Sequence, residues 1–368
     1  MTINLALNGG IIGQASNAAD EYDQASEDEK TMLWQAEYEM WKNGVGELPP
    51  KPQYETMYDD KGLTTAPIPS GFTASATVGE TDIGTGKVIK SVSGADTSEF
   101  VWIPVPHACI DVGTLSDAEI TVALAYEASE GYYPMAVKSA NGDYRGALYD
   151  FQLNAGAVKV IPRRIGDTSY KEPEVLPDSG YDDTATNYTS AGLPSMTAAE
   201  FKTRLQVEFN ETIENVIANG GFYIGRYETS IRTGDIVQSK SGILPMSGRT
   251  WYSMYAVQGS YATDNSIATV SSGMVWGSEW DQMMIWMKDV QNPNAGNKPY
   301  ILDATGMANY SGSKTSTGVN DYKVNNIFDV AGNVRAWTLE MSGPYTRTRR
   351  GRSDMLTALV PSITQPED

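Results

Sequence analysis

The sequence predicts an α+β fold that is rich in loops and is preceded by an N-terminal helix. Three observations support this class. The chain of 368 residues contains 35 Gly and 18 Pro, which indicates many turns. Its 21 Tyr and 8 Trp can build a core where regular sheet is sparse. Residues 14–43 and 197–219 have apolar side chains at helical spacing, whereas the apolar runs between them are short and typical of strands.

The N-terminal helix is expected over residues 14–43, within a first segment of residues 1–48. Its apolar stripe is thin, and acidic residues occupy the opposite positions. A helix of this kind packs along a partner or projects as a stalk. It is expected to end at Gly44 and Gly46, which are followed by Pro49 and Pro50. The stripe consists of Ala18, Tyr22, Ala25, Met32, Ala36 and Met40.

The rest of the chain is expected to form a linker and one large domain. Residues 49–98 combine turn residues with short strands and are interpreted as the linker. The domain covers residues 99–368 and contains a polar surface insertion at about 160–195. Strands are expected at 99–105 and 120–126. A capping box formed by Thr197 and Glu200 begins a helix that ends at Gly220, with one buried face of Phe201, Leu205, Phe209, Ile213 and Val216.

Charge and composition exclude several function classes. The net charge of −19 opposes binding to nucleic acid or to an anionic membrane. A single cysteine, Cys109, allows no intrachain disulfide, and with a single histidine, His107, it cannot form a Cys/His zinc site. A catalytic triad would have to use His107, which lies in an apolar, strand-like run where a structural role is expected. No apolar run is long enough to cross a bilayer, and a basic n-region of a signal peptide is missing.

Four sequence blocks and a shorter fifth follow one another after residue 99. Together they resemble the formylglycine-generating-enzyme (sulfatase-modifying-factor) domain, and the Gly-Asn-Val-x-x-Trp block is the most specific part. The resemblance covers residues 99 to 352 and implies a C-type-lectin-like fold. The blocks are Glu99-Phe-Val-Trp-Ile-Pro, Gly221-Phe-Tyr-Ile-Gly-Arg-Tyr-Glu228, Gly273-Met-Val-Trp-Gly-Ser-Glu279-Trp280, Asn325-Asn-Ile-Phe-Asp329-Val-Ala-Gly332-Asn333-Val-Arg-Ala-Trp337 and Arg347-Thr-Arg-Arg350-Gly351-Arg352.

The same residues have a structural interpretation that does not depend on the resemblance. The residues from Asp329 to Asn333 are typical of a turn, in which Gly332 allows a positive φ and Asn333 bonds nearby backbone. Glu228 and Glu279 are expected to be buried acceptors for loop amides rather than catalytic carboxylates. The predicted structural core consists of Trp102, Tyr227, Glu228, Glu279, Trp280, Asp329, Gly332, Asn333, Trp337 and Arg350.

The chain departs from the enzymes of this family at the ligands of their metals. The copper-binding cysteine pair of the oxidising members lies late in the domain, where this sequence has no cysteine. The iron-dependent members need more than one histidine. We therefore expect no catalysis and no cofactor, although the fold is compatible with a structural calcium ion. The family motif also changes to Gly-Asn-Val-Arg335-Ala336-Trp here.

A non-enzymatic branch of the family fits a chain that keeps these sequence blocks but lacks the metal ligands. It comprises ligand-binding proteins that retroelements (diversity-generating retroelements) diversify in phages and bacteria, with variable residues near the C-terminus. Tyr, Arg, Ser and Asp side chains give adaptable polar contacts. The candidate contact residues are Arg335, Tyr345, Arg347, Arg349, Arg352, Ser353 and Asp354, together with Trp251 and Tyr252. The alternative for residues 341–354 is a solvated tail.

The N-terminus resembles the stretch that follows the membrane helix of type IV prepilin-like surface proteins of Gram-positive bacteria. Residues 5–19 followed by the acidic helix carry this resemblance. We expect an extracellular protein, at a cell surface or on a phage particle, that binds a protein or glycan on another cell or phage. Any membrane attachment would come from an N-terminal helix missing here. Two alternatives stay open, a structural subunit of a phage tail or pilus and an enzyme of this fold with an unrecognised site.

Overall fold

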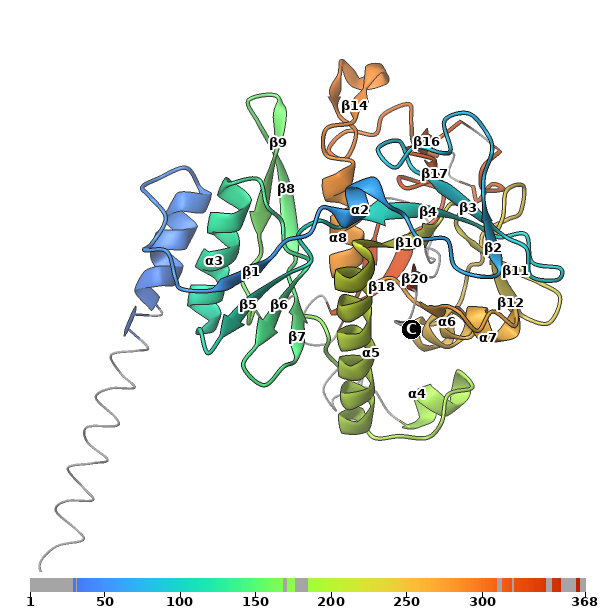
Figure 1. Ribbon diagram of the computed structural model, residues 1–368, viewed down its shortest axis with the longest axis horizontal. Coiled ribbons are helices and arrows are strands. Elements are labelled where there is room, and N and C mark those ends of the chain that lie inside the picture. The colour runs from blue at the N-terminus through green and yellow to red at the C-terminus, as the bar shows by residue number, and fades with distance from the viewer. Residues whose placement is uncertain are drawn as a thin grey trace, which may run out of the picture.

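The computed structural model describes residues 29–30, 32–167, 171–175, 185–309, 313–319, 321–341, 346–351 and 362–364. Helix and strand occur in near-equal proportion, 28% and 26%, so the chain is mixed α and β with small sheets. Figure 1 shows a smaller lobe around β5 and β6 beside a larger lobe that contains α5, α8 and the main sheet. Within the described ranges, no helix combines the length and apolarity needed to span a membrane.

The larger lobe is organised by a six-stranded antiparallel sheet. Its order is β13 (Ser271–Gly273), β20 (Ser362–Thr364), β10 (Gly221–Gly225), β4 (Glu99–Pro104), β3 (Val88–Ser91) and β2 (Phe72–Ala74). The two central strands β4 and β10 pair along their whole length, with Phe222 opposite Ile103. Their apolar side chains are buried on both faces, which explains the continuous apolar sequence of β4.

Helix α5 (Ala198–Asn219) packs against this sheet and confirms the predicted helix in detail. Thr197 and Glu200 form the expected capping box, and Gly220 ends the helix with φ 79°. The five residues predicted for the buried face, from Phe201 to Val216, are all fully buried. The 3.6-residue period and both end signals are strong here, so the sequence alone locates the helix.

The smaller lobe has its own sheet, in the order β1 (Glu55–Met57), β5 (Cys109–Gly113), β6 (Ala136–Ser139) and β7 (Tyr144–Gly146). Helix α3 (Asp117–Ser129) connects the parallel strands β5 and β6. The predicted strand at 120–126 is therefore wrong. A capping box of Ser116 and Glu119 starts the helix, and nearly all sides of it are buried, so its apolar run shows no helical period.

Residues 49–98 are not a linker, because β2 and β3 belong to the main sheet. Strand β3 pairs with β4, so the expected boundary at residue 98 divides a hairpin. The polar stretch at 160–195 was also wrongly interpreted as a surface insertion. It begins in β9 (Ala157–Pro162), the partner of β8 (Tyr149–Asn154), and it buries Glu172 and Tyr188.

The described part of the N-terminal helix covers residues 29–30 and 32–42, and it lies against the smaller lobe (Figure 1). Tyr38 is buried and donates a hydrogen bond to the carbonyl of Pro162, and Lys159 lies over the ring of Trp41. Met32 and Met40 remain exposed. The predicted residues 14–28 of this helix lie outside the described residues.

Shorter elements complete the chain. Helix α8 carries the third sequence block, and the pair β18–β19 carries the end of the fourth block and the fifth. The remaining bounds are α2 (Lys61–Thr64), α4 (Ala185–Ser190), β11 (Thr229–Arg232), β12 (Ile236–Ser239), α6 (Trp251–Gly259), α7 (Tyr261–Asp264), α8 (Gly277–Trp286), β14 (Gln291–Asn292), η1 (Pro293–Ala295), β15 (Lys298–Pro299), β16 (Lys323–Val324), β17 (Ile327–Phe328), β18 (Ala336–Met341) and β19 (Arg347–Arg350).

Candidate functional site

The antiparallel ribbon β18–β19 contains Arg347 and Arg349, two of the residues that were predicted to contact a ligand, and a third, Arg335, directly precedes it. Trp337 lies opposite Arg349, and Ala336 lies opposite Arg350. Because successive side chains of a strand point to opposite faces, Trp337 and Arg349 share one face and Arg350 belongs to the other. The first face is called the outer face below, and the second is called the inner face.

The inner face is fixed to the protein by buried ion pairs. The Arg350 guanidinium donates to Glu340 at 2.9 Å through Nε and lies 3.5 Å from Asp281 on α8. Glu340 also accepts from Nη1 of Arg163 at 2.9 Å. Glu340 and Asp281 are fully buried, and these neighbouring carboxylates raise the pKa of Arg350 despite the opposing effect of its burial. This network holds the Arg350 side chain in the interior, beneath the ribbon.

The other end of the ribbon is anchored by Arg347 and Trp251. The Arg347 guanidinium lies 3.9 Å from the centre of the Trp251 ring and donates to the carbonyl of Glu174 at 2.8 Å. The Trp251 Nε1 donates to the carbonyl of Thr338 at 2.9 Å. Trp251 is 4% exposed and Arg347 is 8% exposed. Both were predicted as ligand contacts, and both instead hold the scaffold together.

The outer face is different, because its cations are not neutralised. Among the described residues, Arg335 and Arg349 have no hydrogen bond or ion pair, and Arg349 lies 4.9 Å from the centre of the Trp337 ring. Partial burial and then the charge of Arg335 lower the pKa of Arg349. Within the same described set, the buried Nε1 of Trp337 has no acceptor. The two guanidinium groups are therefore the unpaired donors of this face, and the Nε1 of Trp337 lies buried beneath its surface.

A pocket of about 540 Å³ lies at the end of the ribbon where β18 begins and β19 ends. Its lining combines apolar side chains with a comparable amount of polar surface, and Arg350 and Gly351 contribute the edge nearest the ribbon. The lining residues are Phe151, Trp280, Met284, Tyr300, Ile301, Leu302, Asp303, Ala304, Thr305, Val330, Ala331, Arg350 and Gly351. The pocket and the outer-face arginines are thus neighbours along the chain.

A second pocket, of about 390 Å³, lies between α5, α6 and β13. Two of its charged side chains, Arg204 and Glu208, pair with each other. The Tyr255 hydroxyl donates to Glu208 at 2.7 Å, and the Arg204 Nε donates to the same carboxylate at 2.8 Å. These groups offer less to a ligand than the unpaired arginines of the ribbon.

The turn from Asp329 to Asn333 forms the support beneath the ribbon. Asn333 has φ 51° and donates to Glu228 Oε2 at 2.5 Å, while the backbone N–H of Val334 donates to Glu228 Oε1 at 3.0 Å. Asp329 accepts from the hydroxyl of Thr317 at 2.8 Å. Burial and then the charge of Asp329 raise the pKa of Glu228. Glu228 is thus a buried acceptor for loop amides.

The third sequence block, at the start of α8, also contains a buried carboxylate that accepts bonds from backbone amides. The Glu279 carboxylate accepts from the N–H of Trp276 at 2.9 Å. Glu172 accepts from the N–H groups of Gly277 and Ser278 at 2.6 and 2.8 Å, in the position that a helix N-terminus offers to an anion. Of the other predicted core residues, Trp280 is buried and Trp102 donates from Nε1 to the carbonyl of Gly62 at 2.9 Å.

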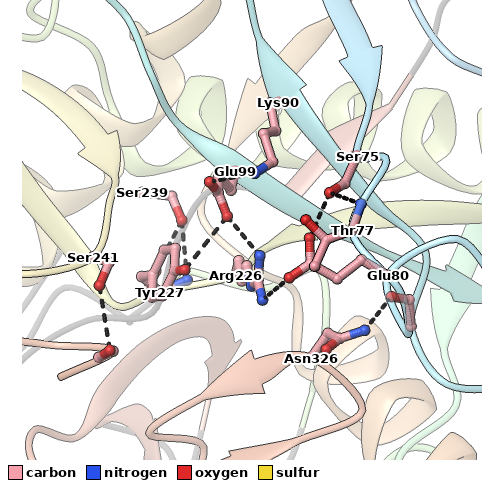
Figure 2. Close-up of polar contacts among 12 residues, drawn as sticks. Ser75, Thr77, Glu80, Lys90, Glu99, Arg226, Tyr227, Ser239, Ser241 and Asn326 are labelled. Carbon is pink, nitrogen blue, oxygen red and sulfur yellow. Dashed lines mark hydrogen bonds and ion pairs between the residues drawn. The ribbon is translucent and has the colours of Figure 1, made fainter. Parts of the chain in front are cut away.

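Sequence reasoning missed a polar cluster around Arg226, which Figure 2 shows. Arg226 donates to Glu80 at 2.6 Å and to Glu99 at 2.7 Å, and it lies 5.5 Å from the ring centre of Tyr227. Asn326 ties the neighbouring loop by donating to the carbonyls of Gly79, Thr85 and Gly86. The cluster fixes two loops to β4. An arginine directly after a buried strand was the available signal.

Four of the predicted contact residues, Tyr345, Arg352, Ser353 and Asp354, lie outside the described residues. Tyr252 is half-buried, and its ring centre lies 5.2 Å from that of Trp251.

In the described part of the chain, no group of three His, Cys, Asp or Glu side chains could hold a metal ion. Comparison of the chain with protein-family models, curated proteins and solved structures gives no match.

Proposed function

We propose that this chain is a non-enzymatic binding protein that recognises a protein or glycan ligand through the outer face of β18–β19 and the adjacent pocket. The single observation that carries this proposal is that two arginines, Arg335 and Arg349, lie beside Trp337 with their charges unneutralised. A chain with net charge −19 has carboxylates in excess, yet these two arginines have no ion pair among the described residues. Arg and Trp are also the side chains that most often dominate binding energy at interfaces.

The groups that could perform catalysis support this proposal. Glu228 and Glu279 accept bonds from backbone amides in the interior. Burial raises the pKa of the Cys109 thiol to about 12, which disfavours the thiolate nucleophile. The His107 ring packs against the rings of Tyr58 and Tyr132, whose centres are each 4.5 Å away, and these two rings also contact each other at 4.9 Å. These contacts support the proposal that the four residues serve the structure and not a reaction.

The finer assignment of the fold is part of the proposal. We place residues 99–368 in the C-type-lectin-like group of formylglycine-generating-enzyme domains, as a binding member diversified by a retroelement. The support is the use of Glu228 and Asn333 as scaffold residues within the family-like blocks. A reverse-transcriptase gene and a near-copy of the DNA for residues about 320–354 beside the gene would support diversification. A structural calcium ion is compatible with this fold, and titration with calcium while unfolding is followed would detect it.

The experiment that tests binding compares the wild type with a triple variant, Arg335→Ala, Trp337→Ala and Arg349→Ala. Both proteins are used to select from a random-peptide display library and to probe a glycan array. We expect ligands that bind the wild type and not the triple variant. The result that would contradict the proposal is a set of ligands that all bind both proteins equally. Far-UV circular dichroism of the variant controls for unfolding.

One observation favours a second function, that of a structural subunit in a phage tail or pilus. Met32, Leu33 and Met40 are 63%, 56% and 50% exposed on the N-terminal helix. An apolar stripe of this kind can pack against another subunit. Under either function we propose an extracellular location, with the helix nearest the cell surface or phage particle. Concentration-dependent sedimentation that is lost in a Met32→Gln, Leu33→Gln variant would favour the structural function.

A further inference from the structure

We infer that residues 171–175 form a proton-linked strap, whose fastened state holds the ribbon β18–β19 in place and binds one proton more than its released state. The inference does not depend on the proposed binding function. It combines two observations. The strap bonds to elements that are distant from it in the sequence, and its Glu172 side chain lies among buried carboxyls that outnumber the neighbouring arginines.

The strap fastens the end of the ribbon where β18 ends and β19 begins. The backbone groups of Lys171 and Met341 exchange two hydrogen bonds, with N···O distances of 3.3 and 3.0 Å. The carbonyl of Glu174 accepts from Nη1 of Arg347 at 2.8 Å. Met341 is the last residue of β18 and Arg347 is the first of β19. The strap therefore holds both strands of the ribbon.

The Glu172 side chain lies between two glycines, Gly146 on β7 and Gly277 at the start of α8. Its carboxyl accepts from the N–H groups of Gly277 and Ser278 at 2.6 and 2.8 Å, and its backbone carbonyl accepts from the N–H of Gly146 at 2.9 Å. A Cβ on Gly277 would lie 3.0 Å from Oε2 of Glu172 and 2.7 Å from Oε2 of Glu340. The absence of a side chain there lets the two carboxyls approach each other.

The interior around Glu172 holds more carboxyls than cations. Glu340 from β18 and Asp281 from α8 are fully buried, and Glu172 is 4% exposed. Arg350 from β19 lies 2.6 Å from Glu340 and 3.5 Å from Asp281, and Arg163, which follows β9, lies 2.9 Å from Glu340. Within the described ranges Glu172 makes no ion pair. Because an uncompensated buried charge is costly, the group is more stable when it holds a proton.

This proton belongs on Glu172, the carboxyl without a cation partner. Burial raises the pKa of Glu172 to about 8, the bonds from Ser278 oppose the rise, and the charge of Glu340 adds to it. Burial also raises the pKa of Asp281, which Arg350 opposes, to about 6. A released strap exposes Glu172 to water, where its ordinary value of 4.5 applies. Between about pH 6 and 8 the fastened state therefore keeps a proton that the released state has lost, and a rise in pH favours release.

Hydrogen–deuterium exchange of the whole chain at a series of pH values tests this linkage. After correction for the intrinsic exchange rate, the protection of a segment reports its opening equilibrium. In the wild type, protection at the start of α8 and in β18 is expected to fall up to tenfold per pH unit between about pH 6 and 8, the slope that one linked proton gives. Residues 209–216 of α5, which make none of the strap's bonds, are the internal control and should keep their protection.

Two variants identify the titrating group. Glu172→Gln removes it, so the protection of α8 and β18 is expected to lose its dependence on pH over this range. Its overall level should also fall, because the amide of Gln cannot accept from both backbone N–H groups. Glu174→Gln is the matched control, since that carboxyl lies on the same strap and pairs with Lys202 at 2.8 Å. Its slope is expected to equal that of the wild type.

Infrared spectroscopy of the wild type detects the proton directly and depends on no variant. The C=O stretch of a protonated carboxyl is separate from the bands of ionised carboxylates, and exposed Asp and Glu are ionised at neutral pH. We expect a protonated carboxyl at neutral pH whose signal disappears as the pH rises through about 8. Glu172→Gln should lack this signal, and Glu174→Gln should retain it.

Four results would overturn the inference. The wild type could show no protonated carboxyl at neutral pH, or its protection at α8 and β18 could stay constant between about pH 6 and 8. Glu172→Gln could retain the slope of the wild type, which would assign the proton to another group. Protection could also fall equally in α5 and β18, which would show a change in global stability and no local release of the ribbon.

Discussion

The variant Gly332→Ala tests whether the turn from Asp329 to Asn333 depends on close backbone contact. Gly332 has φ 97°, a conformation that an L-residue with a Cβ rarely adopts. A Cβ added there would lie 2.5 Å from the carbonyl oxygen of Asn309 and 2.6 Å from its nitrogen. Both atoms belong to the backbone, so no side-chain rotation can remove the overlap.

The expected loss follows from two separate costs. Alanine at a positive φ costs about 1–2 kcal/mol, of which the reduced entropy of the unfolded chain offsets roughly half. Non-bonded carbon contacts need about 3.5 Å, so the Asn309 segment must retreat by about 1 Å. That movement breaks the bond from Asn333 N to the Asn309 carbonyl, at 2.7 Å, and the bond from Asn309 N to the Ala331 carbonyl, at 3.2 Å. Two broken, partly buried bonds add about 2–4 kcal/mol, and we expect a total of about 3–5 kcal/mol, a large share of a typical stability.

Urea unfolding, followed by Trp fluorescence, measures the loss, and Gly242→Ala is the matched control. Gly242 has φ 80°, and an added Cβ there meets no atom within 4 Å, so this variant isolates the conformational cost. We expect it to lose about 1 kcal/mol or less. If the two variants lose the same free energy of unfolding, the contact with Asn309 does not support the turn, and the reasoning is refuted.

Three further predictions concern stability. Phe209→Ala empties a fully buried position whose ring centre lies 4.8 Å from that of Trp276, and it should lower the free energy of unfolding by about 3–5 kcal/mol in urea titrations. Burial raises the pKa of Glu172 from 4.5 to about 8, so the stabilisation from its bound proton is complete below about pH 4.5 and is lost as the pH rises through 8. Thermal unfolding of Glu172→Gln across this range should show a flatter pH profile than the wild type, and parallel profiles would exclude this explanation. Gly259→Ala adds a Cβ at the end of α6 where no atom lies within 4 Å, and it should raise the free energy of unfolding by about 0.5–1 kcal/mol, whereas a destabilised protein would show that the helix end is strained.

Elements with strong local signals were predictable from the sequence. Helix α5 combines a capping box, a clear apolar period and a C-terminal Gly, and all three lie where they were expected. Glu228 and Glu279 were predicted as buried acceptors because an acid within an apolar block must find donors. Asn333 was predicted to bond nearby backbone, but it donates to the distant carbonyl of Thr315 at 3.0 Å, a partner that the local sequence does not indicate.

Features that depend on distant partners were not predictable. Helix α3 is buried almost all round, so its sequence lacks the period that separates helix from strand. Glu172 lies in a polar, Pro-containing stretch, and only the start of α8, more than a hundred residues later, explains its burial. Arg347 has the composition of a surface contact, yet the ring of Trp251 and the carbonyl of Glu174 enclose it. Tertiary pairing, which local sequence does not record, decided each case.

The inner and outer faces of β18–β19 have different roles, and this difference has a consequence for protein engineering. Glu340 and Arg350 fix the ribbon from below, whereas Arg335 and Arg349 contribute no bond to the rest of the described chain. The two outer-face positions can therefore be randomised together without loss of the folded state, while the inner positions cannot. A library built on Arg335 and Arg349 would keep one backbone and change its specificity, whereas Trp337 packs against the core and has to be retained.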